Sequence, residues 1–458
     1  MQYISTRNKN ETASFAEAAL EGLAPDGGLF IPQEIPRYSA AVRSSLGAMD
    51  FTDIAFETIR PYVSGVMDNT ALADIINSSF TFNAPLIAAA DRYAVELFHG
   101  PTAAFKDFGA RFMARSFSHL RRGEDRSLHI LVATSGDTGG AVADGFFNVP
   151  GISVTVLYPK GRVTPLQERQ IAGLGNNIRA VSVEGSFDDC QSLVKAALSD
   201  NGLKERMSLS SANSINISRL IPQAVYYSAA AGRAFAGKAD ADGEATPRVK
   251  SVENNNNVFK AGLPVTLCVP SGNFGNLTAG LYAMKMGAPI TQFIAATNIN
   301  KTIPEYLSSG GYLARVSQAT ISNAMDVGAP SNFERMAAHF SLEEMRKIIL
   351  GIWVSDEETR ETIVRVYDEA GYILDPHSAV GWKGVDKLKE ENKTFDGNFG
   401  IFCTAHPAKF SEVVQPLVGQ IPVPSSLSRA MERTVNSTSI PADTSAFFEL
   451  LNAISPVI

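Results

Sequence analysis

The sequence predicts an α/β fold in which parallel sheets are covered by helices on both faces. Short apolar runs of strand length alternate with helix-compatible stretches through most of the chain, and this alternation is typical of parallel sheets. The chain has 458 residues, of which 45% are hydrophobic and 19% are charged. Because a single hydrophobic core seldom serves more than about 250–300 residues, we expect two or three domains.

The first part of the chain, residues 1–90, reads mainly as helices and loops. Residues 15–23 have the spacing of an amphipathic helix that ends at the turn Pro25-Asp26-Gly27-Gly28, and two or three further helices are expected within residues 51–80. We therefore predict a mainly helical N-terminal domain over residues 1–90. The remaining residues, 91–458, form the predicted α/β region, which we divide into two α/β subdomains.

The α/β region carries the strand and helix candidates in alternation. Strands are expected at residues 128–133, 152–158, 178–183, 264–270, 290–295 and 399–404. Helices are expected at residues 138–147, 164–174, 187–198 and 277–286. Residues 238–260 break this rhythm, because they contain acidic residues and four consecutive asparagines and too few apolar residues to bury. We expect an exposed loop insertion there.

The composition disfavours a polyanion or a bilayer as the main partner. The net charge is −7, which argues against binding to nucleic acid or an anionic membrane, although local positive charge still allows an anionic metabolite. No stretch approaches the roughly 20 apolar residues that span a bilayer, and residues 1–7 lack the pattern of a signal peptide. Cys190, Cys268 and Cys403 form neither a disulfide framework nor a zinc motif. We expect a cytoplasmic protein, as a monomer or a homodimer.

Lys106 is the first candidate for chemistry. It stands between Phe105 and Phe108, after a Gly-Pro turn and at the expected start of a helix. Burial lowers the pKa of a lysine, so that some uncharged amine is present near neutral pH and can act as a nucleophile, as in a Schiff base. The same segment also fits a helix-start lysine whose amine lies in solvent, which is the commoner place for a lysine.

A glycine-containing loop at residues 269–276 is the first candidate anion site. It follows an expected strand and precedes an expected helix, the place where open parallel sheets bind ligands. The loop contains Gly272 and Gly275, which let successive backbone N–H groups converge on a phosphate. It matches neither a Walker loop nor the pattern Gly-x-Gly-x-x-Gly. A tight strand-to-helix connection without a ligand fits the loop equally well.

Two further polar segments could contact an anion. The first is Thr134-Ser135-Gly136-Asp137-Thr138, whose hydroxyls suit a carboxylate or a phosphate; Asp137 instead should face a donor or cap a helix. The second contains Asn213, Ser214 and Asn216, followed by Arg219, which could bind a phosphate through its forked guanidinium. Helix capping and a structural ion pair are the alternative roles of these two segments.

Histidines give no metal site in the sequence. The chain has six, none paired at metal-ligand spacing, and no Gly-x-Ser-x-Gly motif occurs. His99 and His406 lie in suggestive segments, yet we expect structural roles for both. We predict no bound metal.

Taken together, these segments resemble the threonine synthase family, whose members have the type II fold of pyridoxal-phosphate enzymes. The resemblance covers nearly the whole chain and is closest to the longer bacterial and fungal type. The segments that carry it are 3–7 with 23–30, 97–109 around Lys106, 134–140, 271–276 and 404–410. The resemblance implies pyridoxal phosphate as the cofactor and Lys106 as the lysine that forms the Schiff base.

The resemblance also implies roles for the other candidates. The cofactor phosphate would lie in the loop Gly272-Asn273-Phe274-Gly275-Asn276, and Thr404 would hydrogen-bond the pyridine nitrogen. Thr134, Ser135 and Thr138 would receive the substrate carboxylate. Asp137 is counted among these substrate contacts, although cysteine-synthase relatives have an asparagine at its place that approaches the cofactor hydroxyl. The group that grips the substrate phosphate would contain Asn213, Ser214 and Arg219.

The reaction that the resemblance implies converts O-phospho-L-homoserine and water to L-threonine and phosphate, the last step of threonine biosynthesis. It proceeds by γ-elimination of phosphate and addition of water at the β-carbon. Two alternatives stay open. One is another lyase of the same fold, such as a threonine dehydratase or a phospholyase, and the other is a relative that binds a metabolite without catalysis.

Overall fold

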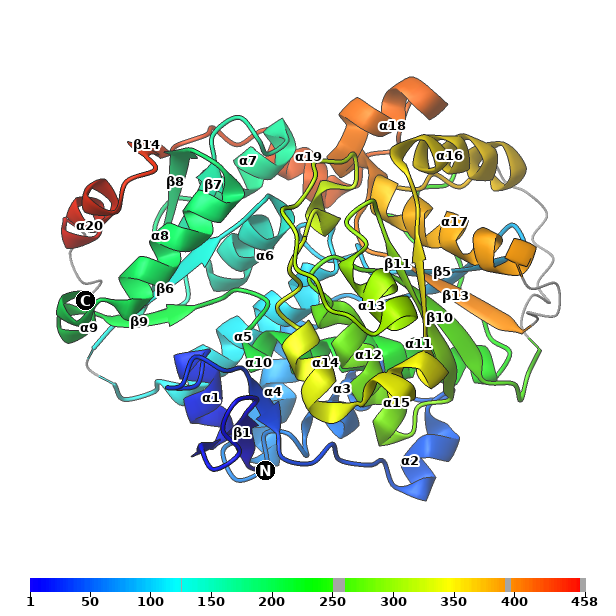
Figure 1. Ribbon diagram of the computed structural model, residues 1–458, viewed down its shortest axis with the longest axis horizontal. Coiled ribbons are helices and arrows are strands. Elements are labelled where there is room, and N and C mark those ends of the chain that lie inside the picture. Colours follow the sequence, from blue (N-terminus) through cyan, green and yellow to red (C-terminus); the bar gives the residue numbers. More distant parts are fainter. Residues whose placement is uncertain (125, 250–259, 392–396, 454–458) are drawn as a thin grey trace.

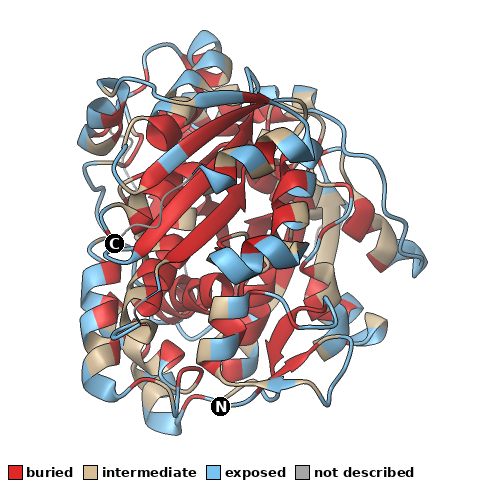
Figure 2. Ribbon diagram, turned by 90° about the vertical axis from the view of Figure 1, so that its left-hand side faces the viewer, coloured by how far each residue is buried: buried red, intermediate tan, exposed pale blue. Residues whose placement is uncertain are grey.

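The computed structural model describes residues 1–124, 126–249, 260–391 and 397–453. It contains two separate sheets of mainly parallel strands, each flanked by helices, with the N-terminal region along one side of both (Figure 1). The central strands of both sheets are almost completely buried, whereas the covering helices expose their outer faces (Figure 2). Strands covered on both faces need continuous apolar sequence, which is the pattern that predicted them.

The N-terminal region combines a small antiparallel sheet with helices. The sheet has the order β2-β1-β3 and contains β1 (Tyr3–Ser5), β2 (Thr12–Ala13) and β3 (Phe30–Pro32). The helices are α1 (Phe15–Glu21), α2 (Ala40–Ser45), α3 (Phe51–Ile59) and α4 (Asn69–Ser79). Helix α1 begins with a capping box of Ser14 and Glu17, which satisfies two of the free N–H groups at its start.

The smaller of the two main sheets has five parallel strands in the order β14-β8-β7-β6-β9. Its strands are β6 (Leu128–Ala133), β7 (Ile152–Pro159), β8 (Ile178–Glu184), β9 (Ser208–Ser211) and β14 (Thr438–Pro441). The associated helices are α5 (Lys106–Leu120), α6 (Asp137–Phe146), α7 (Pro165–Ala172), α8 (Phe187–Ser199), α9 (Asn201–Arg206) and α20 (Thr444–Asn452). The C-terminal strand β14 pairs with β8, so the end of the chain returns to this early sheet.

The larger sheet has six strands in the order β12-β11-β10-β13-β5-β4, and all its neighbours are parallel except β4 and β5. Its strands are β4 (Leu86–Ala89), β5 (Arg92–Glu96), β10 (Val265–Pro270), β11 (Ile290–Thr297), β12 (Ile349–Trp353) and β13 (Asn398–Cys403). The longer helices around it are α11 (Ala224–Phe235), α12 (Gly275–Met286), α16 (Asp356–Ala370) and α17 (Pro376–Glu391).

Short helices connect these layers. They are α10 (Ile217–Leu220), α13 (Thr302–Ser309), α14 (Phe333–His339), α15 (Leu342–Ile348), α18 (Ser411–Val418) and α19 (Ser425–Met431). Three 3₁₀ turns are η1 (Ile221–Gln223), η2 (Asn323–Met325) and η3 (Pro407–Phe410). Among the described residues, no helix is both long and apolar enough to cross a membrane.

The expected insertion at residues 238–260 is only partly exposed, and this expectation was wrong at Thr246 and Pro247, which are buried. The Thr246 hydroxyl donates a 2.8 Å hydrogen bond to the buried carboxylate of Glu96. A polar residue can be buried when it finds such a partner, and composition alone does not reveal the partner. Residues 250–259, with the asparagine run, lie outside the described residues.

Candidate functional site

Lys106 is the first residue of α5, at the end of a tight turn that lies against residues 404–406. The Phe105 N–H donates to the Thr404 carbonyl at 2.9 Å, and the His406 N–H donates to the Ala103 carbonyl at 3.1 Å. Ala103 has a φ of 53°, a left-handed conformation that few residues with a Cβ adopt. These bonds bring Thr404, which follows strand β13 and is buried, next to Lys106.

The Lys106 side chain is only 14% exposed, and its Nζ lies 3.9 Å from an oxygen of Asp137. Burial lowers the pKa of Lys106 to about 8, the positive charges of Lys409 and Arg219 add to this effect, and Asp137 opposes it. With a pKa of about 8, about a tenth of the amine is uncharged at pH 7. Lys106 can therefore act as a nucleophile and as a base near neutral pH.

The loop between β6 and α6 is held by its own hydrogen bonds. Thr134 Oγ1 accepts from the N–H groups of Gly136 and Gly139, at 2.9 and 2.8 Å, which leaves the hydroxyl hydrogen free to donate. Gly136 has a φ of 137°, and a Cβ there would lie 2.4 Å from the Gln167 side chain. Ser135 in the same loop and Thr138 in the first turn of α6 are half-buried, so hydroxyl groups border the N-terminus of α6.

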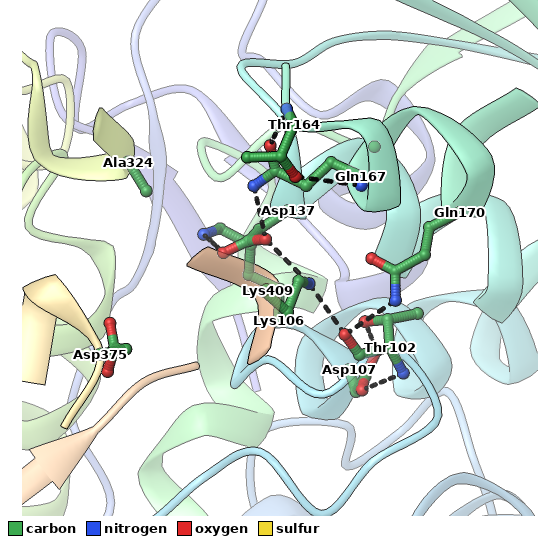
Figure 3. Close-up of polar contacts among 12 residues, drawn as sticks. Thr102, Lys106, Asp107, Asp137, Thr164, Gln167, Gln170, Ala324, Asp375 and Lys409 are labelled. Carbon is green, nitrogen blue, oxygen red and sulfur yellow. Dashed lines mark hydrogen bonds and ion pairs between the residues drawn. The ribbon is translucent and has the colours of Figure 1, made fainter. Parts of the chain in front are cut away.

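Asp137 faces donors, as expected from its chemistry. Its carboxylate accepts from Lys409 Nζ at 2.8 Å and from Gln167 Nε2 at 3.0 Å, as Figure 3 shows. The neighbouring Lys409 and Lys106 hold the pKa of Asp137 well below its usual range despite burial. An ionised carboxylate therefore stands beside the Lys106 amine.

The glycine loop between β10 and α12 is tightly packed. Phe274 precedes α12 with a φ of 59°, and a Cβ on Gly272 would lie 2.7 Å from the Met325 Cα. Asn276 Oδ1 accepts from the hydroxyls of Tyr226 and Tyr227, at 2.6 and 2.8 Å. Asn276 Nδ2 is buried and has no partner within the described residues. A donor of this kind at a helix N-terminus suits an anionic ligand.

The polar cluster at residues 213–219 meets the glycine loop directly. Asn273 Nδ2 donates to Ser214 Oγ at 2.6 Å. Arg219 is 2% exposed; one of its nitrogens donates to the Ala212 carbonyl at 2.7 Å, while its Nε is buried without a partner among the described residues. Asn213 Oδ1 is likewise buried and unpaired there.

Arg219 also lies close to the helix that Lys106 begins. A Cβ on Gly109 would stand 2.7 Å from the Arg219 carbonyl oxygen, so α5 and α10 are in close contact. Burial lowers the pKa of Arg219 to about 10. The guanidinium still carries its charge at neutral pH, and it is available to a phosphate.

The two suggestive histidines make structural contacts. His99 Nε2 pairs with Glu96 at 2.7 Å, and the His406 ring nitrogen Nδ1 accepts from the Ala408 N–H at 3.1 Å. Burial lowers the pKa of His406 to about 3, so that ring is neutral. No group of side chains that could hold a metal ion occurs within the described residues.

Sequence reasoning missed Lys409, Gln167 and Gln170, which complete the surroundings of Lys106 and Asp137. Lys409 Nζ donates to the Thr102 carbonyl at 2.8 Å, and Gln170 Nε2 donates to the same carbonyl at 3.1 Å. Lys409 belongs to the segment 404–410 that carried the family resemblance, and that was the available signal. A lysine that is fully buried cannot be distinguished in sequence from an exposed one.

Comparison with known protein families covers most of the chain. The family described as "Threonine synthase N terminus" matches residues 2–80. "Pyridoxal-phosphate dependent enzyme" matches residues 93–399, and "Threonine synthase, C-terminal" matches residues 378–450.

Individual proteins match over their whole length. The threonine synthase of Escherichia coli (strain K12) is 38% identical over 455 residues, which are 98% of this chain and 99% of that protein. The crystal structure of threonine synthase from Escherichia coli aligns with a TM-score of 0.85 at 37% identity, covering 99% of both chains. The structure of PLP-bound threonine synthase from Brucella melitensis aligns with a TM-score of 0.85 at 34% identity, covering 98% of both chains.

Proposed function

The chain belongs to the threonine synthase family of pyridoxal-phosphate-dependent enzymes, and from this premise we propose that it converts O-phospho-L-homoserine and water to L-threonine and phosphate. Its fold is the type II fold of pyridoxal-phosphate enzymes. The observation that carries the proposed substrate is the buried Arg219, whose Nε has no partner among the described residues. A buried cation with an unpaired donor fits a substrate that carries a phosphate.

The residues around Lys106 fit pyridoxal phosphate. The Lys106 amine is mostly buried with a lowered pKa, which suits a lysine that bonds the cofactor carbonyl. The tight loop at Gly272 and the unpaired Asn276 Nδ2 suit the cofactor phosphate, together with Asn273, Phe274 and Gly275. The backbone of Thr404 bonds the residue before Lys106, and we propose that the neutral Thr404 hydroxyl meets the pyridine nitrogen.

The reaction needs a group that withdraws electrons and a base that can take up and release protons. Pyridoxal phosphate, when bound, withdraws electrons from the carbon that carries the substrate amine. We assign to Lys106 the removal of the Cα proton, because its amine is the base that stands at the site with a pKa near the working pH. The remaining proton transfers accompany loss of a Cβ proton, departure of phosphate from Cγ, protonation at Cγ and addition of water at Cβ.

The two ends of the substrate have separate partners in this proposal. Ser135, Thr138 and the free hydroxyl hydrogen of Thr134 receive the carboxylate at the N-terminus of α6, where the helix dipole favours negative charge. The phosphate lies with Arg219, Ser214 and Asn213. Donors held in place at the leaving group also stabilise the charge that develops there.

Product analysis tests the proposed substrate. We expect purified protein with added pyridoxal phosphate to release threonine and phosphate in equal amounts from O-phospho-L-homoserine, and to leave threonine itself unchanged. Release of 2-oxobutyrate as the main product from either compound would favour a dehydratase or a phospholyase instead. A protein that bound the cofactor without turning over either compound would revive the non-catalytic alternative.

The domain division at residue 90 stays a prediction. So do a cytoplasmic place in the cell and assembly as a monomer or a homodimer. The small-molecule substrate follows from the family, and we propose that it is O-phospho-L-homoserine.

A further inference from the structure

Lys409 is a second lysine at the site, and it differs from Lys106 in exposure and in hydrogen bonding. Its side chain is 0% exposed, and its Nζ donates at 2.8 Å both to Asp137 Oδ1 and to the Thr102 carbonyl. The Lys106 side chain is 14% exposed, and its Nζ lies 3.9 Å from Asp137 Oδ2, beyond hydrogen-bond distance. The structure therefore leaves Lys106 free to react and fixes Lys409 in place.

Asp137 is shared between these two lysines in a definite way. Its Oδ1 accepts from Lys409 Nζ and from Gln167 Nε2, at 2.8 and 3.0 Å, and these two bonds fix the orientation of the carboxylate. Its Oδ2 faces Lys106 at 3.9 Å. A charge at this distance in a buried site acts on the amine through space, without a direct hydrogen bond that would hold the amine in place.

Lys409 also contacts the turn from which Lys106 projects. The Thr102 carbonyl accepts from Lys409 and from Gln170, and the Thr102 N–H donates to Asp107 at 2.9 Å. The buried chain Gln167–Asp137–Lys409–Thr102 thus joins α7, α6, η3 and the turn before α5 (Figure 3). Both the charge beside Lys106 and the backbone that presents it depend on Lys409.

We propose that Asp137 and Lys409 are positioning residues for Lys106. Lys409 fixes the carboxylate of Asp137 beside the Lys106 amine and anchors the turn that presents this amine. The negative charge of Asp137 favours the protonated form of Lys106, and the positive charge of Lys409 favours the uncharged form. This inference rests on the proposed role of Lys106. The other charged groups that face Lys106 are Arg219 from α10 and Asp375 before α17; Asp107 faces Lys409.

The expected effects follow from the signs of the charges. Asp137→Asn removes the anion that favours charged Lys106, so its pKa falls. Lys409→Met removes a nearby positive charge, and Lys106 is then the remaining lysine beside the Asp137 carboxylate. The pKa of Lys106 therefore rises. A charge at such a distance shifts a pKa by about one unit or more. If Asp137 and Lys409 served only to stabilise the fold, the two substitutions would not shift the pKa of Lys106 in opposite directions.

The test measures the rate at which the full-length protein, freed of bound cofactor, captures added pyridoxal phosphate at different pH values. The uncharged amine attacks the carbonyl, so the midpoint of the rate profile reports the pKa of Lys106. We expect the midpoint to move down by about one pH unit in Asp137→Asn and up by about one unit in Lys409→Met. Lys160→Met is the matched control, because Lys160 is an exposed lysine paired with Glu184 at 2.9 Å; its profile should equal that of the unaltered protein.

Two results would overturn the inference. One is an unchanged midpoint in Asp137→Asn, and the other is a shift in the same direction in both variants. If Lys409→Met does not fold, Asp137→Asn decides alone, and the double variant Asp137→Asn/Lys409→Met should return close to the original midpoint. Borohydride reduction followed by peptide mapping separates this inference from the proposed function: label on a lysine other than Lys106 contradicts the role of Lys106 itself.

Discussion

Asn273 and Ser214 are 59 positions apart in the sequence, yet the Asn273 amide donates a 2.6 Å hydrogen bond to the Ser214 hydroxyl. This bond joins the glycine loop before α12 to the polar cluster before α10. In the proposed function, the first segment holds the phosphate of the cofactor and the second holds the phosphate of the substrate. The two anion sites are therefore neighbours, and a substitution in one should also change binding at the other.

Ser214→Ala removes the hydroxyl that accepts from Asn273. We expect the KM for O-phospho-L-homoserine to rise about 5-fold, since one hydrogen bond contributes about 1 kcal/mol, with a smaller loss of cofactor affinity. Steady-state kinetics and a cofactor titration measure the two effects. Ser192→Ala is the control, because Ser192 lies on the exposed face of α8 and its hydroxyl donates to the Asp188 carbonyl, far along the chain from both loops. An unchanged KM in Ser214→Ala would remove Ser214 from the substrate site.

Arg219→Lys keeps the charge and loses the forked geometry. We expect kcat/KM for the phosphorylated substrate to fall about 100-fold or more, because a placed donor at a departing charge contributes on that scale. The matched control is Arg60→Lys, an exposed arginine that pairs with Glu57 at 2.9 Å. Kinetics of both variants provide the measurement. Full activity in Arg219→Lys would show that a point charge suffices and that the fork has no role.

Gly272→Ala introduces a methyl group where the loop has no room for it. The new Cβ would lie 2.7 Å from the Met325 Cα, so the backbone must shift, and we expect weaker binding of pyridoxal phosphate. Gly311→Ala is the control, since its Cβ would approach only Ser309 Oγ, at 3.8 Å. Equilibrium titration with the cofactor compares the two. Equal affinities would mean that the loop does not cradle the cofactor.

The pH dependence of cofactor capture follows from the lowered pKa of Lys106, about 8. The reactive amine is the form without the proton, so the capture rate should rise with pH between about 7 and 9 and level off above that range. An exposed lysine with an ordinary pKa, about 10.4, would still be rising at pH 9. Stopped-flow absorbance at several pH values distinguishes the two profiles. A plateau that appears only above about pH 10 would contradict burial of the amine.

The sequence predicted the architecture well where local pattern decides the outcome. Apolar runs located β6, β7, β8, β10, β11 and β13, because buried parallel strands require them. Strand β14 was missed: only Ile440 of its four residues is buried, so it has no apolar run. It forms because a distant edge of the sheet, β8, is available to it.

The candidate site was predictable in its segments and not in its contacts. The family resemblance located Lys106, the loop at Gly272 and the cluster at Arg219, and the structure brings these segments together. The sequence alone did not reveal the role of Lys409, since the burial of this lysine depends on Asp137, a carboxylate 272 positions away in the chain. The burial of Thr246 was not predicted for the same reason, because it depends on the distant Glu96.

The central claim is that the Lys106 amine bonds the cofactor and moves the substrate's Cα proton. The most direct test is steady-state release of threonine and phosphate from O-phospho-L-homoserine by the unaltered protein and by Lys106→Ala. We predict that the variant stays folded, loses the visible absorbance that pyridoxal phosphate gains on bonding a protein amine, and loses turnover by about 1,000-fold or more. Turnover retained in Lys106→Ala at a comparable rate would contradict the claim.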